Sequence, residues 1–508
     1  MAISRRHFAA TLAAGLAGGL PERLPALRSR PKLFVFLIAE QFRQVYLERS
    51  AHLLVAGGFK RLMEEAVYYP DCRLDAASFT AGGLATLATG AYPQLHGIVA
   101  DQWYDRKAHS PTTASATLLE ATTLADEAAR LDKSRTFCLG LHHDSLSLLA
   151  GRSPAQLFWM DDQGLFTANQ HVEWLAEYNR LRPIENLHNA LWMAVGAGEG
   201  FPPLRTLSFD PSHPEEFMSL YRSSPHCQDA QFELLRNVLV TEKLGQGDTL
   251  DFVFASLGSM ELLGYETGSD SPLMEQMVLW LDRQVKVTLE ALDKTPGPGN
   301  YNLIFAAAHG APAEPDGITR PRAAVEGERL ARTISDGLTD WIDKGTVKNV
   351  YVEKYIYPFL YLKLDALRKQ NVTPRGARRL AAELALRQPG VAGFYTADGE
   401  CTHSGEWRRR FENSFYELRS GDVMLSYAPG TVEETGTRHG ISYGSLYNYD
   451  TRVPLFLYGA QFGAQMIERP IELVDLAPTI ARAAGLSAPS SATGAVLGEA
   501  FADEKHGK

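Results

Sequence analysis

Three short apolar runs constrain the fold of this chain more than any other feature. They are LFVFLIA at residues 33–39, DFVFAS at 251–256 and NLIFAAA at 302–308. Near-continuous apolar runs of this length are typical of parallel strands that are buried on both faces. Between the second and third runs, apolar residues recur at helical spacing over residues 273–292. This alternation predicts an α/β fold with a doubly wound, mostly parallel sheet that is flanked by helices.

Polar side chains lie close behind these runs. Glu40 comes directly after the first, Glu261 follows the second, and His309 comes directly after the third. His439 precedes a further apolar run at residues 453–458. Because the carboxyl ends of parallel strands meet at one edge of an open α/β sheet, we expect these groups to line a common crevice.

The segment AASFTAGGLATLATGAYPQLH at residues 76–96 is expected to form a short helix that stops at Gly90. Thr80 would then stand at or just before the helix N-terminus, where backbone N–H groups favour an anion. Two interpretations of its hydroxyl stay open at this point. It is either an attacking nucleophile or a helix-capping group.

Three stretches carry a resemblance to a known family. The first is FTAGGLATLATGAYPQLHGIVADQWYD, which begins at Phe79. The other two are residues 229–256 and 436–459. They resemble the alkaline phosphatase superfamily, in particular its type I phosphodiesterase/nucleotide pyrophosphatase branch and the threonine-nucleophile alkaline phosphatases. The likeness spans roughly residues 32–501. It implies an alkaline-phosphatase-like fold and hydrolysis of phosphate esters, with Thr80 as the nucleophile beside two zinc ions.

The metal ligands that the resemblance implies are only partly present. Two of the family's histidines are kept as His309 and His439, and two of its aspartates are replaced by Glu40 and Glu261. The resemblance implies that one metal would draw on Glu40, Thr80 and His309, and the other on Glu261 and His439.

Two further ligand positions are lost. Tyr265 stands where the family has a histidine, and Ala308 stands where it has an aspartate. Zinc sites normally use three or more protein ligands, so these losses predict a degenerate centre that holds one or two zinc ions if it is competent and none if it is not.

The substrate side departs from the family as well. Asp101 stands where the family often has an asparagine near the phosphate, and the lysine and arginine of the monoesterases align near His142 and Asp144. An anionic ester beside these carboxylates would be opposed by about 1 kcal/mol or more each at surface-like dielectric. A neutral or cationic ligand would meet no such penalty.

The first thirty residues are expected to be a targeting segment. Residues 4–8 read SRRHF, which resembles the twin-arginine export motif, and an apolar stretch over residues 8–20 follows. That stretch is too short to cross a membrane and suits a signal h-region. The predicted location is therefore periplasmic or secreted. Such a compartment permits disulfides among Cys72, Cys138, Cys227 and Cys401, which could equally be free thiols.

The chain divides into a signal peptide and linker at 1–30 and an alkaline-phosphatase-like domain at 31–508. Within the domain, residues 161–240 and 317–440 are expected to contain cap or inserted segments. The formal charge of −10 argues against a nucleic-acid partner. The expected partner is a small-molecule phosphate ester or another crevice ligand.

Three functions remain open from the sequence. The first is an exported phosphoric- or sulfuric-ester hydrolase with an altered metal centre, and the second is a non-catalytic relative that uses the crevice for binding. The third is a hydrolase without zinc in which a nearby histidine or glutamate activates Thr80.

Overall fold

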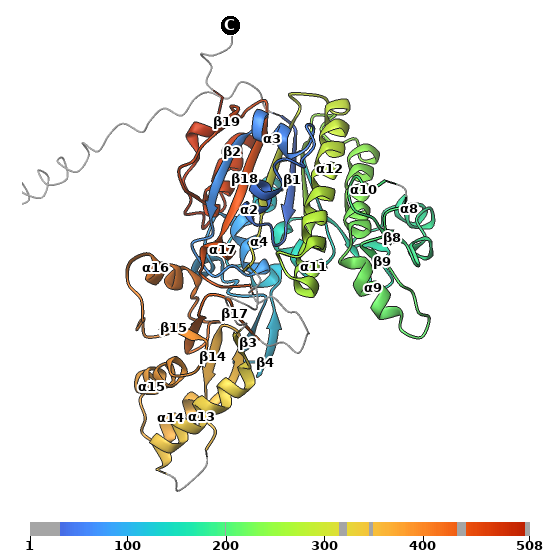
Figure 1. The fold of residues 1–508 in the computed structure, drawn as a ribbon. Coiled ribbons are helices and arrows are strands. Elements are labelled where there is room, and N and C mark those ends of the chain that lie inside the picture. The colour runs from blue at the N-terminus through green and yellow to red at the C-terminus, as the bar shows by residue number, and fades with distance from the viewer. Residues whose placement is uncertain (1–30, 199, 314–322, 345–348, 434–442, 503–508) are drawn as a thin grey trace, which may run out of the picture.

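The largest feature of the fold is a ten-stranded sheet (Figure 1). A computed structural model describes residues 31–198, 200–313, 323–344, 349–433 and 443–502. The strands run in the order β19-β2-β18-β11-β1-β10-β5-β6-β7, with β20 beside β2. Their bounds are β1 Leu33–Ala39, β2 Val67–Arg73, β5 Ser134–Leu139, β6 Gln156–Met160, β7 Phe166–Ala168, β10 Leu250–Leu257, β11 Tyr301–Ala307, β18 Arg452–Gly459, β19 Gln465–Met466 and β20 Ile471–Glu472.

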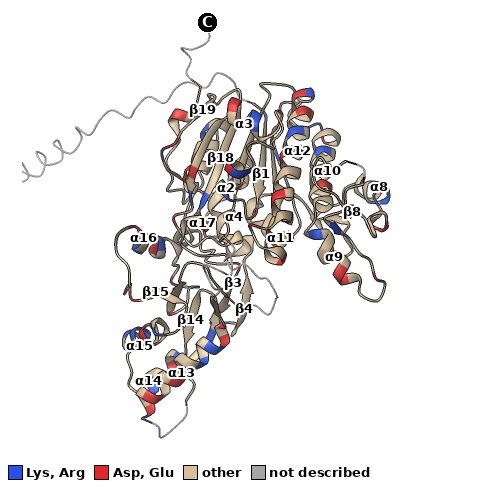
Figure 2. Ribbon diagram, in the orientation of Figure 1, with Lys and Arg blue, Asp and Glu red and all other residues tan. Residues whose placement is uncertain are grey.

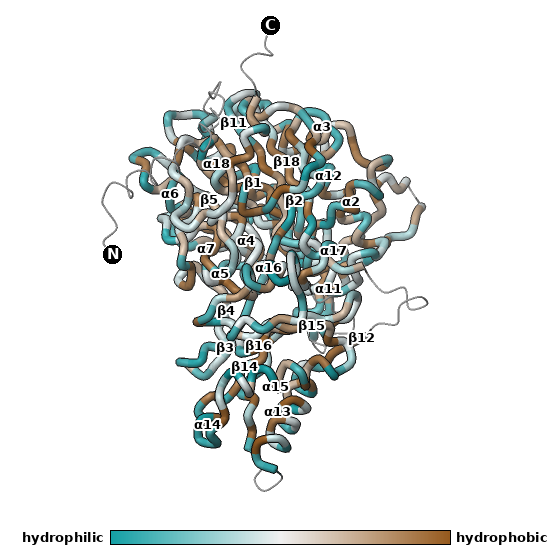
Figure 3. Tube along the Cα trace, turned by 90° about the vertical axis from the view of Figure 1, so that its left-hand side faces the viewer, coloured by the Kyte–Doolittle hydropathy of each residue, from teal (hydrophilic) through white to brown (hydrophobic). Residues whose placement is uncertain are grey.

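The three apolar runs form the centre of this sheet. β1 pairs in parallel with β10 on one side and β11 on the other, and every residue of β1 is buried. The central strands are brown in Figure 3 because their residues are apolar. The predicted α/β fold is therefore confirmed. The sheet is mixed, however, because β18 runs antiparallel to both β11 and β2.

Helices cover the sheet in two groups. One group contains α10, α11 and α12, with α2 and α3 packed against α12; the other contains α4, α6, α7 and α18. Charged residues are concentrated on the helices, whereas the central strands carry almost none (Figure 2). The bounds are α2 Gln44–Ser50, α3 Phe59–Glu65, α4 Thr80–Thr89, α5 Pro93–His96, α6 Leu124–Ala128, α7 His143–Ala150, α10 Pro225–Thr241, α11 Ser259–Thr267, α12 Pro272–Lys294 and α18 Leu476–Ala484.

A second, smaller sheet forms a lobe below the first in Figure 1. It has the order β13-β14-β16-β15 and is backed by α13 and α15 around its own apolar core. The bounds are α13 Gly327–Asp343, β13 Val352–Ile356, β14 Phe359–Leu362, α14 Leu364–Lys369, α15 Pro374–Leu386, β15 Val391–Thr396, α16 Gly405–Ser414 and β16 Val423–Tyr427. This sheet falls inside the stretch 317–440. That this stretch and 161–240 act as a cap stays a prediction.

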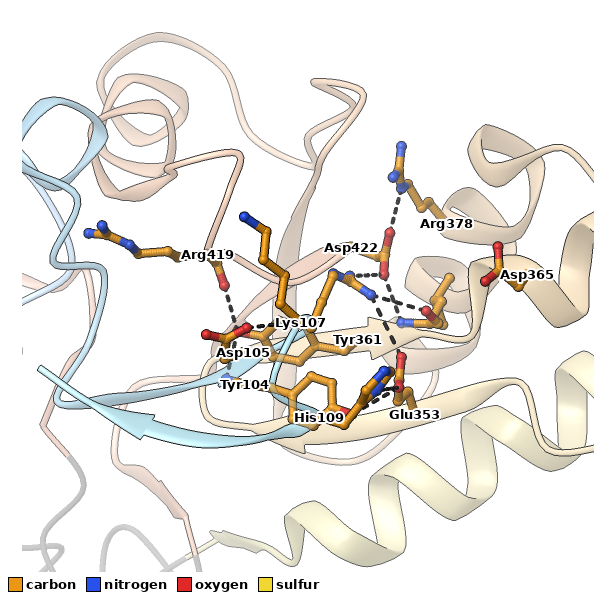
Figure 4. A network of polar contacts seen from close by, with 12 residues as sticks. Tyr104, Asp105, Lys107, His109, Glu353, Tyr361, Asp365, Arg378, Arg419 and Asp422 are labelled. Carbon is orange, nitrogen blue, oxygen red and sulfur yellow. Dashed lines mark hydrogen bonds and ion pairs between the residues drawn. The ribbon is translucent and has the colours of Figure 1, made fainter. Parts of the chain in front are cut away.

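A short hairpin connects the main domain with this lobe. Its strands are β3 (Gln102–Asp105) and β4 (Ser110–Thr113), and it directly follows the Thr80 segment. The Asp422 carboxyl, directly before β16, receives hydrogen bonds from Arg106 in the turn of the hairpin, from Arg378 on α15 at 2.8 Å and from the Leu362 amide at 2.7 Å (Figure 4). An apolar cluster that includes Phe79 also spans the two lobes.

Other expectations concern the cysteines and the N-terminus. All four cysteines are free thiols, and three of them are buried. None of the helices in the described ranges is long and apolar enough to cross a bilayer. The expected export signal at residues 1–30 lies outside the described residues.

Candidate functional site

Four of the polar residues singled out from the sequence meet at the carboxyl edge of the central strands. Glu40 follows β1, Glu261 lies in the first turn of α11 after β10, and His309 lies just after β11. Thr80 is the first residue of α4. Its Oγ1 atom lies 2.9 Å from Glu261 Oε1 and 2.9 Å from His309 Nε2. The chain therefore brings a hydroxyl, a carboxylate and an imidazole into direct contact.

Backbone geometry fixes the position of Thr80. Phe79 is the N-cap in an extended conformation, and Gly90 ends the helix with a φ of 67°, as expected from the sequence. Thr80 is therefore the first helical residue and not the N-cap, and the N-cap Phe79 makes no side-chain capping hydrogen bond. Gly83 lets the helix approach β11 closely, because a Cβ atom there would lie 2.1 Å from the Ala308 carbonyl oxygen. Thr80 is thereby held over the strand end.

Glu40 and Glu261 form a hydrogen-bonded pair. Burial, followed by the charge of Glu261, raises the pKa of Glu40 well above its usual range. Burial also acts to raise the pKa of Glu261, but His309 and hydrogen bonds from its neighbours bring it below the usual value. Of the two, Glu40 therefore holds its proton to the higher pH, and it also accepts a short hydrogen bond from Ser256. Glu261 carries the negative charge.

His309 presents a free electron pair to Thr80. Its Nδ1 atom lies 2.7 Å from the Gly310 carbonyl oxygen, which can only accept, so Nδ1 carries the hydrogen. Burial lowers the pKa of His309, and the ring is therefore neutral near pH 7. Nε2 is then an acceptor facing the Thr80 hydroxyl. The hydroxyl has a single hydrogen to share between His309 and Glu261.

Two tyrosines complete the cluster. Tyr265 lies four residues after Glu261 on the same face of α11, and its hydroxyl donates to Glu261 Oε1 at 3.0 Å. Tyr443 stacks on the His309 ring with centroids 4.3 Å apart, and its hydroxyl donates to Asp101 Oδ2 at 2.8 Å. Sequence reasoning missed Tyr443. Its only signal is that it follows the expected ligand His439 within the same motif.

Asp101 occupies the N-terminus of α4. Its Oδ1 atom accepts the Ala81 N–H at 2.7 Å, so a carboxylate of the chain itself takes one of the amides that would favour a bound anion. Burial, with a smaller contribution from Glu261, raises the pKa of Asp101 to about 6, and the group is ionised at neutral pH.

His142 and Asp144 are exposed at the start of α7. His142 and Tyr265 border a common cavity of about 720 Å³.

The donor atoms at this site do not fit the two zinc ions that the resemblance implies. Tyr265 and Ala308 supply no carboxylate or imidazole, and the remaining donors Glu40, Thr80 and Glu261 satisfy one another directly. Within the described ranges, no group of three or more His, Cys, Asp or Glu residues is arranged to hold a metal ion. His439 lies outside those ranges, and its role as a ligand stays a prediction.

Comparisons with known proteins agree with the resemblance. A family model described as type I phosphodiesterase/nucleotide pyrophosphatase matches residues 34–438. Alkaline phosphatase PhoV from Synechococcus elongatus is 24% identical over 524 residues, which cover 94% of each chain. Alkaline phosphatase PafA from Elizabethkingia meningoseptica is 24% identical over 535 residues, which cover 92% of this chain and 94% of PafA.

Solved structures support the same fold. The crystal structure of alkaline phosphatase PafA matches with a TM-score of 0.81 at 22% identity and covers 94% of this chain and 100% of its own. Murine ectonucleotide pyrophosphatase/phosphodiesterase 5 matches with a TM-score of 0.54 at 13% identity and covers 90% of this chain and 96% of its own. The predicted membership of the alkaline phosphatase superfamily is confirmed.

Proposed function

The chain belongs to the type I phosphodiesterase/nucleotide pyrophosphatase family, and we propose that it is an exported member that lacks two-zinc ester hydrolysis and whose crevice binds a small molecule. The motif at residues 4–8 supports the export, by the twin-arginine route to the periplasm or the medium. The rest of the proposal concerns the crevice around Thr80.

One observation carries the loss of two-zinc chemistry. The Thr80 hydroxyl and the Tyr265 hydroxyl both lie within 3.0 Å of the same Glu261 oxygen. A metal bound there would have to break both contacts, and it would find Tyr265 and Ala308 where two further ligands are needed. The expected nucleophile is therefore held as a member of a closed hydrogen-bonded cluster.

Electrostatics favour a binding role over anion hydrolysis. Glu261 and Asp101 are both ionised near neutral pH, and no described basic side chain forms an ion pair with either of them except His309, which is neutral. A phosphate ester would bring further negative charge into this buried region, where charges are only weakly screened. A neutral or cationic ligand avoids that repulsion.

Elemental analysis together with turnover assays tests this proposal. We expect folded protein incubated with excess zinc to hold much less than one zinc per chain and to leave p-nitrophenyl phosphate and bis(p-nitrophenyl) phosphate uncleaved. The matched gain-of-function variant combines Tyr265→His with Ala308→Asp, and we expect it to bind more zinc than the natural chain. Two zinc ions in the natural chain, with turnover that Thr80→Ala abolishes, would contradict the proposal.

A second candidate function is metal-independent hydrolysis by Thr80. The 2.9 Å contact between Thr80 Oγ1 and the unprotonated Nε2 of His309 favours it, because a neutral imidazole in this position can accept the hydroxyl proton as the oxygen attacks. An inactive variant of murine ectonucleotide pyrophosphatase/phosphodiesterase 5 has been solved with AMP, which makes a nucleotide ester a reasonable test substrate.

Chelator-treated protein separates the two candidates. Turnover of an ester that persists in EDTA and is lost in both Thr80→Ala and His309→Gln would establish the second. Absence of turnover across phosphate mono- and diesters, with both variants folded as judged by circular dichroism, is the result that the binding role requires.

A further inference from the structure

A second cavity adjoins the candidate site on the side of Asp101. Its volume is about 730 Å³, and its walls include Phe79, the residue before Thr80, and Tyr355 and Tyr357 of the second lobe. The cavity therefore lies where the two sheets meet. It is large enough for a small organic ligand.

Aromatic rings form one side of this cavity. Phe79 and Tyr357 meet edge to face with their centroids 5.9 Å apart, and Tyr357 packs in turn on Tyr427 at 5.0 Å. Tyr443, which contacts Asp101, lies 6.2 Å from Phe79. The faces of such rings attract cations through their quadrupoles.

The charged groups along the cavity are acidic. Its described lining residues include no lysine or arginine, and its carboxyl groups belong to Asp101, Glu326, Glu328 and Glu433. Glu328 pairs with Lys354 at 3.3 Å, whereas Glu433 and Asp101 accept hydrogen bonds from neutral groups only, among them the Tyr427 hydroxyl at 2.5 Å and the Tyr443 hydroxyl at 2.8 Å. Asp101 and Glu326 leave the lining with a net negative charge.

A buried carboxyl next to the aromatic wall provides an independent observation. Asp450 is fully buried, and its Oδ1 atom has no hydrogen-bond partner among the described residues. Its charge reaches the Tyr357 hydroxyl, where it acts together with burial to raise the pKa of that group. Above about pH 7, where Asp450 is ionised, a cation held against the Tyr357 ring would therefore interact favourably with Asp450 as well as with Asp101.

We propose that this cavity binds an organic ammonium ion, with its charge between Asp101 and the faces of Phe79 and Tyr357. The inference rests on the proposed binding function and names its ligand class. The aromatic wall contributes cation–π attraction and apolar contact, and the carboxyl groups contribute charge. An anionic ligand is disfavoured by the same groups.

Calorimetric titration of the exported, full chain tests the ligand class. The probes are benzylammonium and its neutral isostere benzyl alcohol, with tetramethylammonium and 1,4-diaminobutane as further cations. We expect saturable binding of at least one cation, and binding of benzyl alcohol at least tenfold weaker than that of benzylammonium. Equal affinities for the isosteric pair, or saturable binding of none of the three cations, would overturn the proposal.

Two variants place the site. We expect Asp101→Asn and Tyr357→Leu each to weaken cation binding at least tenfold, whereas Asp365→Asn on the far, exposed side of the second lobe leaves it unchanged. Unchanged affinity in both of the first two variants, with folding verified by circular dichroism, would also contradict the assignment. Zinc content and ester turnover are measured on the same samples, so failure of the proposed function is recognised independently of the cation result.

Discussion

At the scale of single residues, buried carboxyl groups decide how the stability of this chain depends on pH. Asp450 is fully buried, and burial raises its pKa to about 7 from an ordinary value near 4. The folded chain thus keeps this proton over a range in which the unfolded chain has lost it. Stability from this group is complete below about pH 4 and is lost as the pH rises through about 7.

We therefore expect Asp450→Asn to flatten the pH dependence of unfolding. An amide cannot ionise, so the variant should gain about 2.5 kcal/mol of stability relative to the natural chain on going from pH 5 to pH 8. Urea unfolding at the two pH values measures this difference. The exposed Asp365→Asn variant is the control, and an unchanged pH dependence in Asp450→Asn would contradict the argument.

The sequence indicated, for a physical reason, that certain polar groups would meet at one edge of the sheet. Glu40 and His309 directly follow strands that a continuous apolar run identifies, and parallel strands bring their carboxyl ends together. Tyr443 and Asp450 follow no such rule. They come after the second lobe, Tyr443 in irregular chain and Asp450 in the short helix Asn448–Thr451, and no local pattern encodes the path of this segment.

At the scale of elements, the contact between α4 and β11 positions Thr80. The sequence indicated both elements, since the small-residue segment ends at a glycine and the apolar run has strand length. It did not indicate how closely they approach, because that distance depends on one missing side chain at Gly83. The sequence also did not indicate the direction of β18, which runs antiparallel to β11. A strand that is buried on both faces shows the same apolar run in either direction.

Alanine substitutions at two neighbouring glycines test this contact. Gly83→Ala would place a methyl group 2.1 Å from the Ala308 carbonyl oxygen, whereas at Gly82 the nearest atom lies at 3.6 Å. We expect Gly83→Ala to lower the free energy of unfolding by about 1–3 kcal/mol through overpacking. Gly82→Ala should be neutral or stabilising by up to about 1 kcal/mol, because alanine favours helix. Equal effects in denaturant titrations would show that α4 does not depend on the close approach.

At the scale of the whole molecule, Asp422 connects the two lobes. Its side chain is 1% exposed and bonds two arginines and a backbone amide, one of the arginines being Arg106 beside the hairpin. Asp422→Asn leaves the half-buried guanidinium groups of Arg106 and Arg378 without the negative charge that pairs with them. We expect it to cost about 1–3 kcal/mol and to increase hydrogen exchange in β13, β14 and the hairpin before the main sheet. Asp365→Asn, which affects an exposed pair, should change neither quantity.

The Asp101 carboxylate at the start of α4 also has a consequence for any free anion that enters the crevice. A group attached to the same chain competes at an effective concentration of millimolar or above, and it cannot be diluted away. Inorganic phosphate or a phosphate ester would have to displace this resident competitor from the Ala81 amide before it could bind there. The Asp101 carboxylate therefore acts as an intramolecular inhibitor of anion binding at the start of α4, and this inhibition is independent of protein concentration.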